Sequence, residues 1–145
     1  MRLLALSMLM ALSLLALEPS AVQVEAAVAP VYPELAVVGR IAGSVVVAVR
    51  VSKQGAVTDA NVVEGEDLLR QASLSAARQW RFRAPSSPTD LQLIFTYKLM
   101  PKGTPESELG AIFRPPYTVE VRRINPGPVH HYAQAAPPVR DTHPD

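Results

Sequence analysis

Cysteine is absent from this sequence, and its absence limits both the stability and the chemistry that the chain can have. Without cysteine, export to an oxidising compartment would form no disulfide, so the fold must be held together by its hydrophobic core. An N-terminal cysteine for lipid attachment is missing as well. Strong charge of one sign is also lacking. The formal net charge of +1 gives no electrostatic argument for binding nucleic acid or an anionic membrane surface.

Residues that carry catalysis or bind metals are sparse. The three histidines, His130, His131 and His143, all lie in a proline-containing stretch at the C-terminus. They would suggest a metal site, but without cysteine or a rigid scaffold a solvated tail explains them better. No serine stands near a histidine in sequence, and no Gly-rich loop is present to cradle a phosphate. We therefore predict no catalytic residue, no metal and no cofactor, and expect that the protein is not an enzyme.

What the chain does contain is 145 residues, 48% of them hydrophobic, enough for one small domain with tails. Residues 1–26 have the features of an export signal, with a positive charge followed by an uncharged apolar run over residues 3–17. This run is shorter than the roughly 20 residues that span a bilayer, so a cleaved signal is favoured over an uncleaved anchor, which remains the alternative. Small residues suited to cleavage occur at Ala21 and at Ala26, which has Val24 two positions earlier. We expect an exported protein.

A valine-rich stretch predicts the central strand of the domain. Valine occupies alternate positions in residues 43–51, and the two-residue period of a β-strand puts these side chains on one face, toward the core. The opposite face is also largely apolar, which suits a strand that is partly covered on both sides. Residues 52–55 end in a glycine, as in a tight hairpin, so residues 56–63 should return antiparallel.

An amphipathic helix should follow this hairpin. The acidic residues at positions 64, 66 and 67 stand where a helix N-terminus favours negative charge. An apolar stripe recurs at helical spacing, the helix is expected to run to Phe82, and Pro85 prevents it from continuing. The predicted structural core consists of Val45, Val47, Val49, Val51, Leu69, Ala72, Ala76, Trp80 and Phe82.

The clearest alternation of apolar and polar side chains is in residues 91–99. We predict a third strand there, antiparallel to the first. Residues 100–116 are expected to form a loop, and residues 117–124 a fourth strand at the edge of the sheet. Residues 125–145 contain five prolines and little apolar periodicity, which predicts an unstructured tail.

A short lead-in helix is predicted over residues 32–40, before the central strand. Pro33 suits its first turn and Gly39 suits its exit. Tyr32 beside this proline has two interpretations, a contact with a partner protein or a packing anchor that orients the helix. The packing interpretation carries more weight, because an aromatic residue next to proline is more often packed than used.

Several pieces of this pattern together resemble the C-terminal domain of the TonB family. They are, in chain order, Tyr32-Pro33, Arg40-Ile41-Ala42-Gly43, Gly55-Ala56-Val57, residues 69–77, and Trp80-Arg81-Phe82-Arg83 with Pro85. The resemblance covers roughly residues 32–99 and departs at Ala42, a position that is commonly acidic in the family. It implies an α+β fold in which a small antiparallel sheet of three to four strands packs against one main helix. We place this domain at residues 30–124.

The resemblance also implies a location in the periplasm and a function, because family members bind other envelope proteins rather than catalyse reactions. An extended segment of a TonB-dependent outer-membrane receptor, or of a related envelope protein, would add as a strand to the outer edge of residues 91–99. Residues 117–124 are long enough to occupy the same edge and would compete with that segment. The candidate partner-binding residues are Tyr32, Pro33, Leu91, Leu93, Phe95, Tyr97 and Leu99.

The chain differs from the energy transducers of the family, which have a membrane anchor and a long Pro-rich spacer. Only 14 residues run from Glu18 to Val31, and they reach about 50 Å when fully extended. The alternative function is therefore a structural envelope component, not coupled to transport, that pairs through its sheet edge with itself, as a homodimer, or with another protein. Contact with a membrane would involve residues 1–26 alone, if these are not removed.

Overall fold

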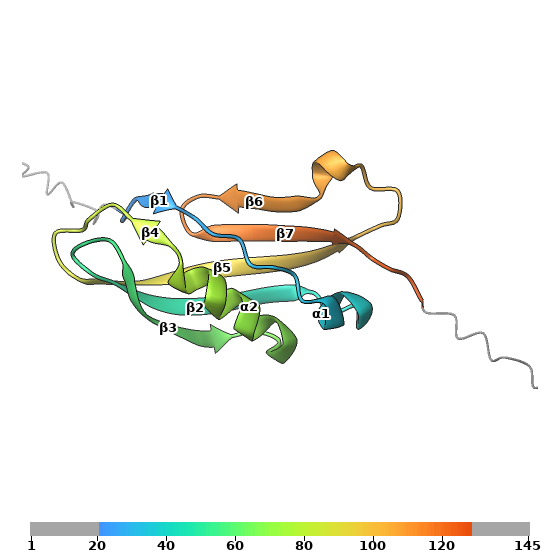
Figure 1. The fold of residues 1–145 in the computed structure, drawn as a ribbon, viewed down its shortest axis with the longest axis horizontal. Coiled ribbons are helices and arrows are strands. Elements are labelled where there is room, and N and C mark those ends of the chain that lie inside the picture. Colours follow the sequence, from blue (N-terminus) through green and yellow to red (C-terminus); the bar gives the residue numbers. More distant parts are fainter. Residues whose placement is uncertain (1–20, 129–145) are drawn as a thin grey trace, which may run out of the picture.

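The computed structural model describes residues 21–128, and in this part of the chain two helices and seven strands form an α+β fold (Figure 1). The helices are α1 (Glu34–Val38) and α2 (Asp67–Arg78), and the strands are β1 (Val24–Ala26), β2 (Gly43–Val51), β3 (Val57–Glu64), β4 (Arg81–Phe82), β5 (Thr89–Met100), β6 (Gly110–Arg114) and β7 (Thr118–Ile124). A short 3-10 turn lies at Glu106–Glu108. Residues 1–20 and 129–145, with most of the predicted signal and all three histidines, lie outside the described residues.

The central hairpin forms as the valine pattern predicts. β2 pairs antiparallel with β3 on one side and with β5 on the other. Its alternate valines are buried in the core, at positions 45, 47, 49 and 51. Gly55 closes the turn with a φ of 84°, and a Cβ there would lie 1.9 Å from the carbonyl oxygen of Phe82. Only glycine fits this close approach between the hairpin and the chain after α2.

The helix α2 is shorter than predicted, because it ends at Arg78 and the expected extension to Phe82 is wrong. Beyond the helix, the Phe82 N–H donates to the Gly55 carbonyl at 2.8 Å, a bond that requires extended backbone, and β4 forms there instead. The buried stripe also differs by one position. Ala72 is half-buried, while Ser73 is buried and its hydroxyl donates to the Leu69 carbonyl at 2.9 Å.

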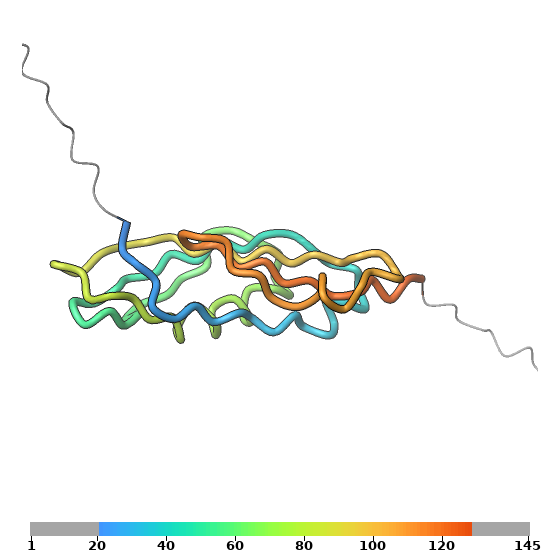
Figure 2. The backbone as a smooth tube through the Cα atoms, turned by 90° about the horizontal axis from the view of Figure 1, so that it is seen from above, coloured from blue at the N-terminus to red at the C-terminus, as the bar shows by residue number. Residues whose placement is uncertain are grey.

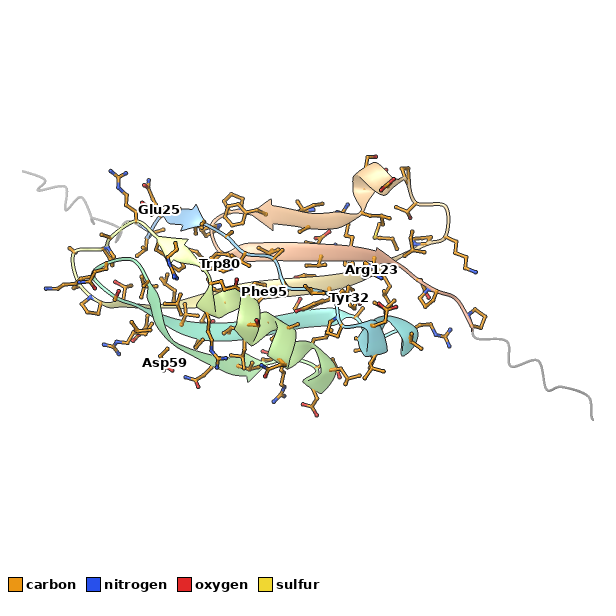
Figure 3. All side chains as sticks on the ribbon, in the orientation of Figure 1. Glu25, Tyr32, Asp59, Trp80, Phe95 and Arg123 are labelled. Atoms are coloured by element: carbon orange, nitrogen blue, oxygen red, sulfur yellow. The ribbon has the colours of Figure 1, made fainter. Side chains whose placement is uncertain are left out.

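The core lies between the sheet and the layer formed by α2 and the N-terminal segment. Trp80 lies in this core, and the centroid of its ring system is 5.9 Å from that of Phe82 and 6.0 Å from that of Phe95 (Figure 3). The other predicted core residues, apart from the half-buried Ala72, are buried with it. The aromatic side chains of Trp80, Phe82 and Phe95 and the small Ala76 and Ala77 of α2 therefore belong to one buried cluster.

The C-terminal part of the sheet departs most from the prediction. Within residues 21–128 the main sheet has five strands in the order β3-β2-β5-β7-β6, not three or four. The strand expected over residues 117–124 exists as β7, but it runs parallel to β5 and is covered by β6, so its prediction as an edge strand is wrong. β6 lies within residues 100–116, which were expected to be a loop. A parallel neighbour requires the chain to return to its starting end, and β6 provides that return.

The N-terminal segment lies along the core face of the sheet beside α2 (Figures 1 and 2). Val22, Val24 and Val28 pack against the core, and β1 pairs antiparallel with β4. The indole N–H of Trp80 donates to the Val28 carbonyl at 2.9 Å. No helix among residues 21–128 combines the length and the hydrophobicity needed to cross a membrane.

Candidate protein-binding edge

The predicted partner-binding residues of β5 point their side chains into the molecule. Leu93, Phe95 and Tyr97 are buried, and Leu91 and Leu99 are partly buried against the same core. Their side chains therefore do not form a surface patch. A protein that adds a strand at this edge would bind the main chain of β5 rather than these side chains.

Tyr32 and Pro33, the other predicted contacts, lie where the N-terminal segment enters α1. Tyr32 is 2% exposed, its hydroxyl donates to the Ile41 carbonyl at 2.6 Å, and its ring meets that of Tyr97 edge-on at 5.1 Å. Burial raises the pKa of the Tyr32 hydroxyl. Pro33 is half-buried and immediately precedes α1. These contacts are those of a packing anchor.

Tyr97 connects β5 to α2 through a buried hydroxyl pair. Its oxygen lies 2.8 Å from the hydroxyl oxygen of Ser73, which donates to the Leu69 carbonyl. Burial raises the pKa of Tyr97 to about 12, although the hydrogen bond with Ser73 lowers it. The hydroxyl thus stays protonated over the physiological pH range, and the pair fixes the position of β5 beneath the helix.

The outer edge of β5 is occupied over most of its length by β7. The two strands run parallel from the pair Ile94 and Thr118 to the pair Met100 and Ile124. A hydrogen bond of 2.8 Å from the Asn125 N–H to the Met100 carbonyl closes the far end. The edge that was predicted to bind a partner therefore already accepts a strand of this chain.

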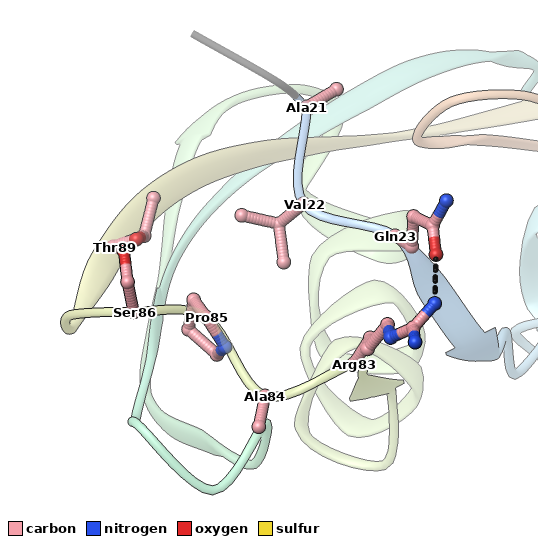
Figure 4. A pocket seen from close by; sticks show the side chains of 8 residues that line it. All are labelled: Ala21, Val22, Gln23, Arg83, Ala84, Pro85, Ser86 and Thr89. Carbon is pink, nitrogen blue, oxygen red and sulfur yellow. Dashed lines mark hydrogen bonds between the residues drawn. The ribbon is translucent and has the colours of Figure 1, made fainter.

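The first residues of β5 are different, because no strand within residues 21–128 pairs with the outer edge of residues 89–93. The Ile94 N–H donates outward, to the Tyr117 carbonyl at 2.9 Å. Main-chain groups of alternate residues point to the same edge, so those of Asp90 and Gln92 point outward as well. Beside this stretch lies an open hollow of about 630 Å³ that is lined in part by Thr89 and Val22 (Figure 4).

A buried carboxylate holds the last three strands of the sheet together. Glu120 of β7 is 4% exposed, and its oxygens lie 3.1 Å from Lys98 Nζ, 3.2 Å from Arg114 Nε and 2.5 Å from Arg122 Nε. These cations come from β5, β6 and β7, so the cluster spans all three strands. Because Val119 and Val121 point into the core, Glu120 lies on the opposite face of the sheet.

The charge state of Glu120 follows from this arrangement. Burial alone would raise the pKa of its carboxyl, but hydrogen bonds from Arg122, Lys98 and Arg114 outweigh burial and lower the pKa to about 2. The carboxylate is therefore ionised at neutral pH. This cluster could not be recognised from the sequence, apart from one acidic residue among basic ones, because its members come from three strands whose register was not predicted.

Within residues 21–128, β6 and β3 form the two outer edges of the main sheet. Phe113 of β6 lies on the core face, with its ring 6.1 Å from that of Trp80, yet it is 43% exposed. The pair Ile112-Phe113 was the only sequence signal for this strand, and it is too short for a period to be recognised. β6 thus presents a partly apolar edge.

The described residues hold no group of three or more His, Asp or Glu side chains that could bind a metal ion. Among the comparisons with known proteins, the family model described as "Gram-negative bacterial TonB protein C-terminal" matches residues 28–99. No curated protein matches the chain. The matched range begins in the N-terminal segment and ends near the end of β5, so β7, β6 and the Glu120 cluster lie largely beyond it.

Proposed function

We propose that this protein captures an extended segment of another protein by strand addition at the outer edge of β5. The proposal starts from the match over residues 28–99, by which the chain belongs to the TonB C-terminal family. Membership in this family gives the coarser part of the function, which is protein binding in the bacterial cell envelope. The finer part is that the captured segment belongs to a TonB-dependent outer-membrane receptor or a related envelope protein. We propose that the protein works in the periplasm.

The observation that supports this proposal is the pairing state of β5. Its outer edge pairs with β7 over residues 94–100, so the main chain of β5 can form a strand ladder on that side. Residues 89–93 continue the same edge without a partner strand in the described part of the chain. Unpaired main-chain groups at a sheet edge are satisfied by an added strand. A partner segment could therefore pair with residues 89–93 without displacing β7.

Binding along the whole edge requires β7 to leave. Displacing it would expose Val119 and Val121 and would separate Glu120 from Lys98. Burying apolar area is worth about 25 cal/mol per Å², and a buried carboxylate left without its partners is costly. We therefore expect the complete domain to bind extended peptides weakly, through residues 89–93, and the domain without β7 to bind them more tightly.

Affinity measurements with one peptide test this proposal. A receptor-derived extended peptide is titrated into residues 21–145 and into a chain that ends at Pro101, and the same peptide with proline at alternate positions serves as the control, because proline cannot donate to the ladder. We expect a lower Kd for the shorter chain and no binding of the proline peptide. Equal affinity for both peptides would show that main-chain pairing is not the mode of binding.

The alternative function, a structural envelope component, rests on β6. This outermost strand carries the half-exposed Phe113, so two copies could pair along it without using β5. Sedimentation of the purified protein over a range of concentrations distinguishes the functions. A stable dimer that is lost in Ala111→Pro, which removes an N–H from the outer edge of β6, would favour assembly, whereas a monomer that recovers a receptor from envelope extracts would favour capture.

A further inference from the structure

Residues 22–26 join the folded domain by main-chain bonds that do not depend on their side chains. β1 pairs with β4, placing Val24 opposite Phe82 and Ala26 opposite Arg81. Just before β1, the Arg83 N–H donates to the Gln23 carbonyl at 2.8 Å. The Arg83 guanidinium also donates to the Gln23 side-chain oxygen at 3.1 Å (Figure 4). These contacts give β4 its antiparallel partner.

The same residues also cover the core. Val22 and Val24 alternate with the exposed Gln23 and Glu25, and both valines pack against the buried cluster. The Tyr117 hydroxyl donates to the Val22 carbonyl at 2.8 Å. Since Tyr117 immediately precedes β7, this bond connects the N-terminal segment to the C-terminal strands. The segment therefore joins two parts of the domain that are far apart in sequence.

This arrangement conflicts with the cleavage site that the sequence pattern favours. Small or β-branched residues three positions and one position before the cut would place cleavage after Ala26, with Val24 at the earlier position. That cut would remove β1 and both packed valines, and it would leave the Tyr117 hydroxyl without its acceptor. A cut after Ala21, the other small residue, would leave every one of these contacts intact.

We propose that the exported protein retains residues 22–26, with any leader peptide ending at or before Ala21, and that this segment is a permanent part of the binding domain. The proposal rests on the envelope location given above, but not on strand capture at β5. It moves the start of the domain from residue 30 to residue 22.

The first experiment produces the full chain in a Gram-negative host and measures the intact mass of the protein in the periplasmic fraction. We expect a first residue at or before Val22. A first residue after Val22 would overturn the proposal. A full-length mass in the periplasmic fraction would support retention, whereas recovery only in the cytosol would overturn the proposal, because the proposal requires export.

The second experiment compares the thermal melts of two purified chains, residues 22–145 and residues 27–145. We expect the shorter chain to melt at least about 5 °C lower, or not to fold, given how steeply Tm depends on lost contacts in a domain of this size. The control is Glu25→Ala in the longer chain, which removes an exposed side chain of β1 and should shift Tm by less than about 2 °C. Equal melting temperatures for the two chains would overturn the proposal even if the segment is retained.

Discussion

Residues 28–99 and residues 101–124 both contribute strands to the main sheet, but they differ in the direction of strand pairing and in their polar contacts. The first region, which the family model matches, consists of antiparallel strands whose valines and aromatic side chains are buried under α2. The second region adds β6 and β7 through parallel pairing to β5, through Val119 and Val121 in the same core, and through an ionic cluster on the opposite face of the sheet. The difference indicates that strands beyond the matched range occupy an edge of β5 that residues 28–99 by themselves leave unpaired.

Disrupting the core of the first region should have the largest effect. Trp80 is fully buried and contacts Phe82, Phe95 and Phe113, so Trp80→Ala should lower the free energy of unfolding by about 3 to 5 kcal/mol. Denaturant melts measure this loss. Phe113→Ala is the matched control from the second region and should cost clearly less, because that ring is half-exposed. A loss below about 1 kcal/mol for Trp80→Ala would mean that Trp80 is not part of the core.

Neutralising the ionic cluster should have an intermediate effect that is confined to the second region. Glu120→Gln removes the charge that three cations share, and we expect a loss of about 2 kcal/mol, less than for a fully buried pair because Lys98 and Arg114 are about half exposed. Arg50→Gln is the control, since its ion pair with Asp90 is exposed on both sides and should contribute less than about 0.5 kcal/mol. Equal losses of unfolding free energy in the two variants would show that the buried ion pairs of Glu120 stabilise the fold no more than an exposed pair does.

The contribution of Glu120 to stability should decrease as the pH falls, and Glu120→Gln measures that decrease. The folded-state pKa of Glu120, about 2, lies below its usual value of 4.5, so its stabilising effect is fully present above pH 4.5 and is lost as the pH falls toward 2. The difference in stability between the natural chain and Glu120→Gln should therefore shrink over this range and be small near pH 2. Urea melts at several pH values measure it. A difference that stays constant from pH 6 to pH 2.5 would contradict the low pKa.

The smallest effect should come from truncation beyond both regions. Residues 129–145 contain three prolines and no apolar periodicity, so we expect their removal to change Tm by less than about 2 °C. Differential scanning calorimetry of chains with and without these residues tests this. A large drop would show that the tail contributes to the packing of the domain.

The first region could be predicted from the sequence largely because its signals are local. Alternating valines, the turn at Gly55 and the helical spacing from Leu69 to Ala76 each specify their element within a few residues, and the structure confirms all three. The end of α2 was missed because the bond from Phe82 to Gly55 joins residues 27 positions apart. The burial of Ser73 was missed because it depends on the hydroxyl of Tyr97, which belongs to another element.

The second region could not be predicted in the same way. The strand over residues 117–124 was recognised by its alternation, but its parallel direction depends on β6, whose five residues carry no recognisable period. The Glu120 cluster in turn depends on the register of β5, β6 and β7 together. Interactions that depend on the register of several strands are invisible to a pattern read along one of them.

The central claim, that β5 binds an extended partner segment and that β7 limits this binding, is tested most directly by mapping amide chemical shifts during a peptide titration. The experiment uses ¹⁵N-labelled protein in three forms: residues 21–145, the same chain with Glu120→Gln to loosen β7, and the chain that ends at Pro101. We predict shift changes confined to residues 89–93 in the first form and extending to residues 94–99 in the other two, with the tightest binding in the shortest chain. Shift changes that avoid β5 in all three forms would contradict the account.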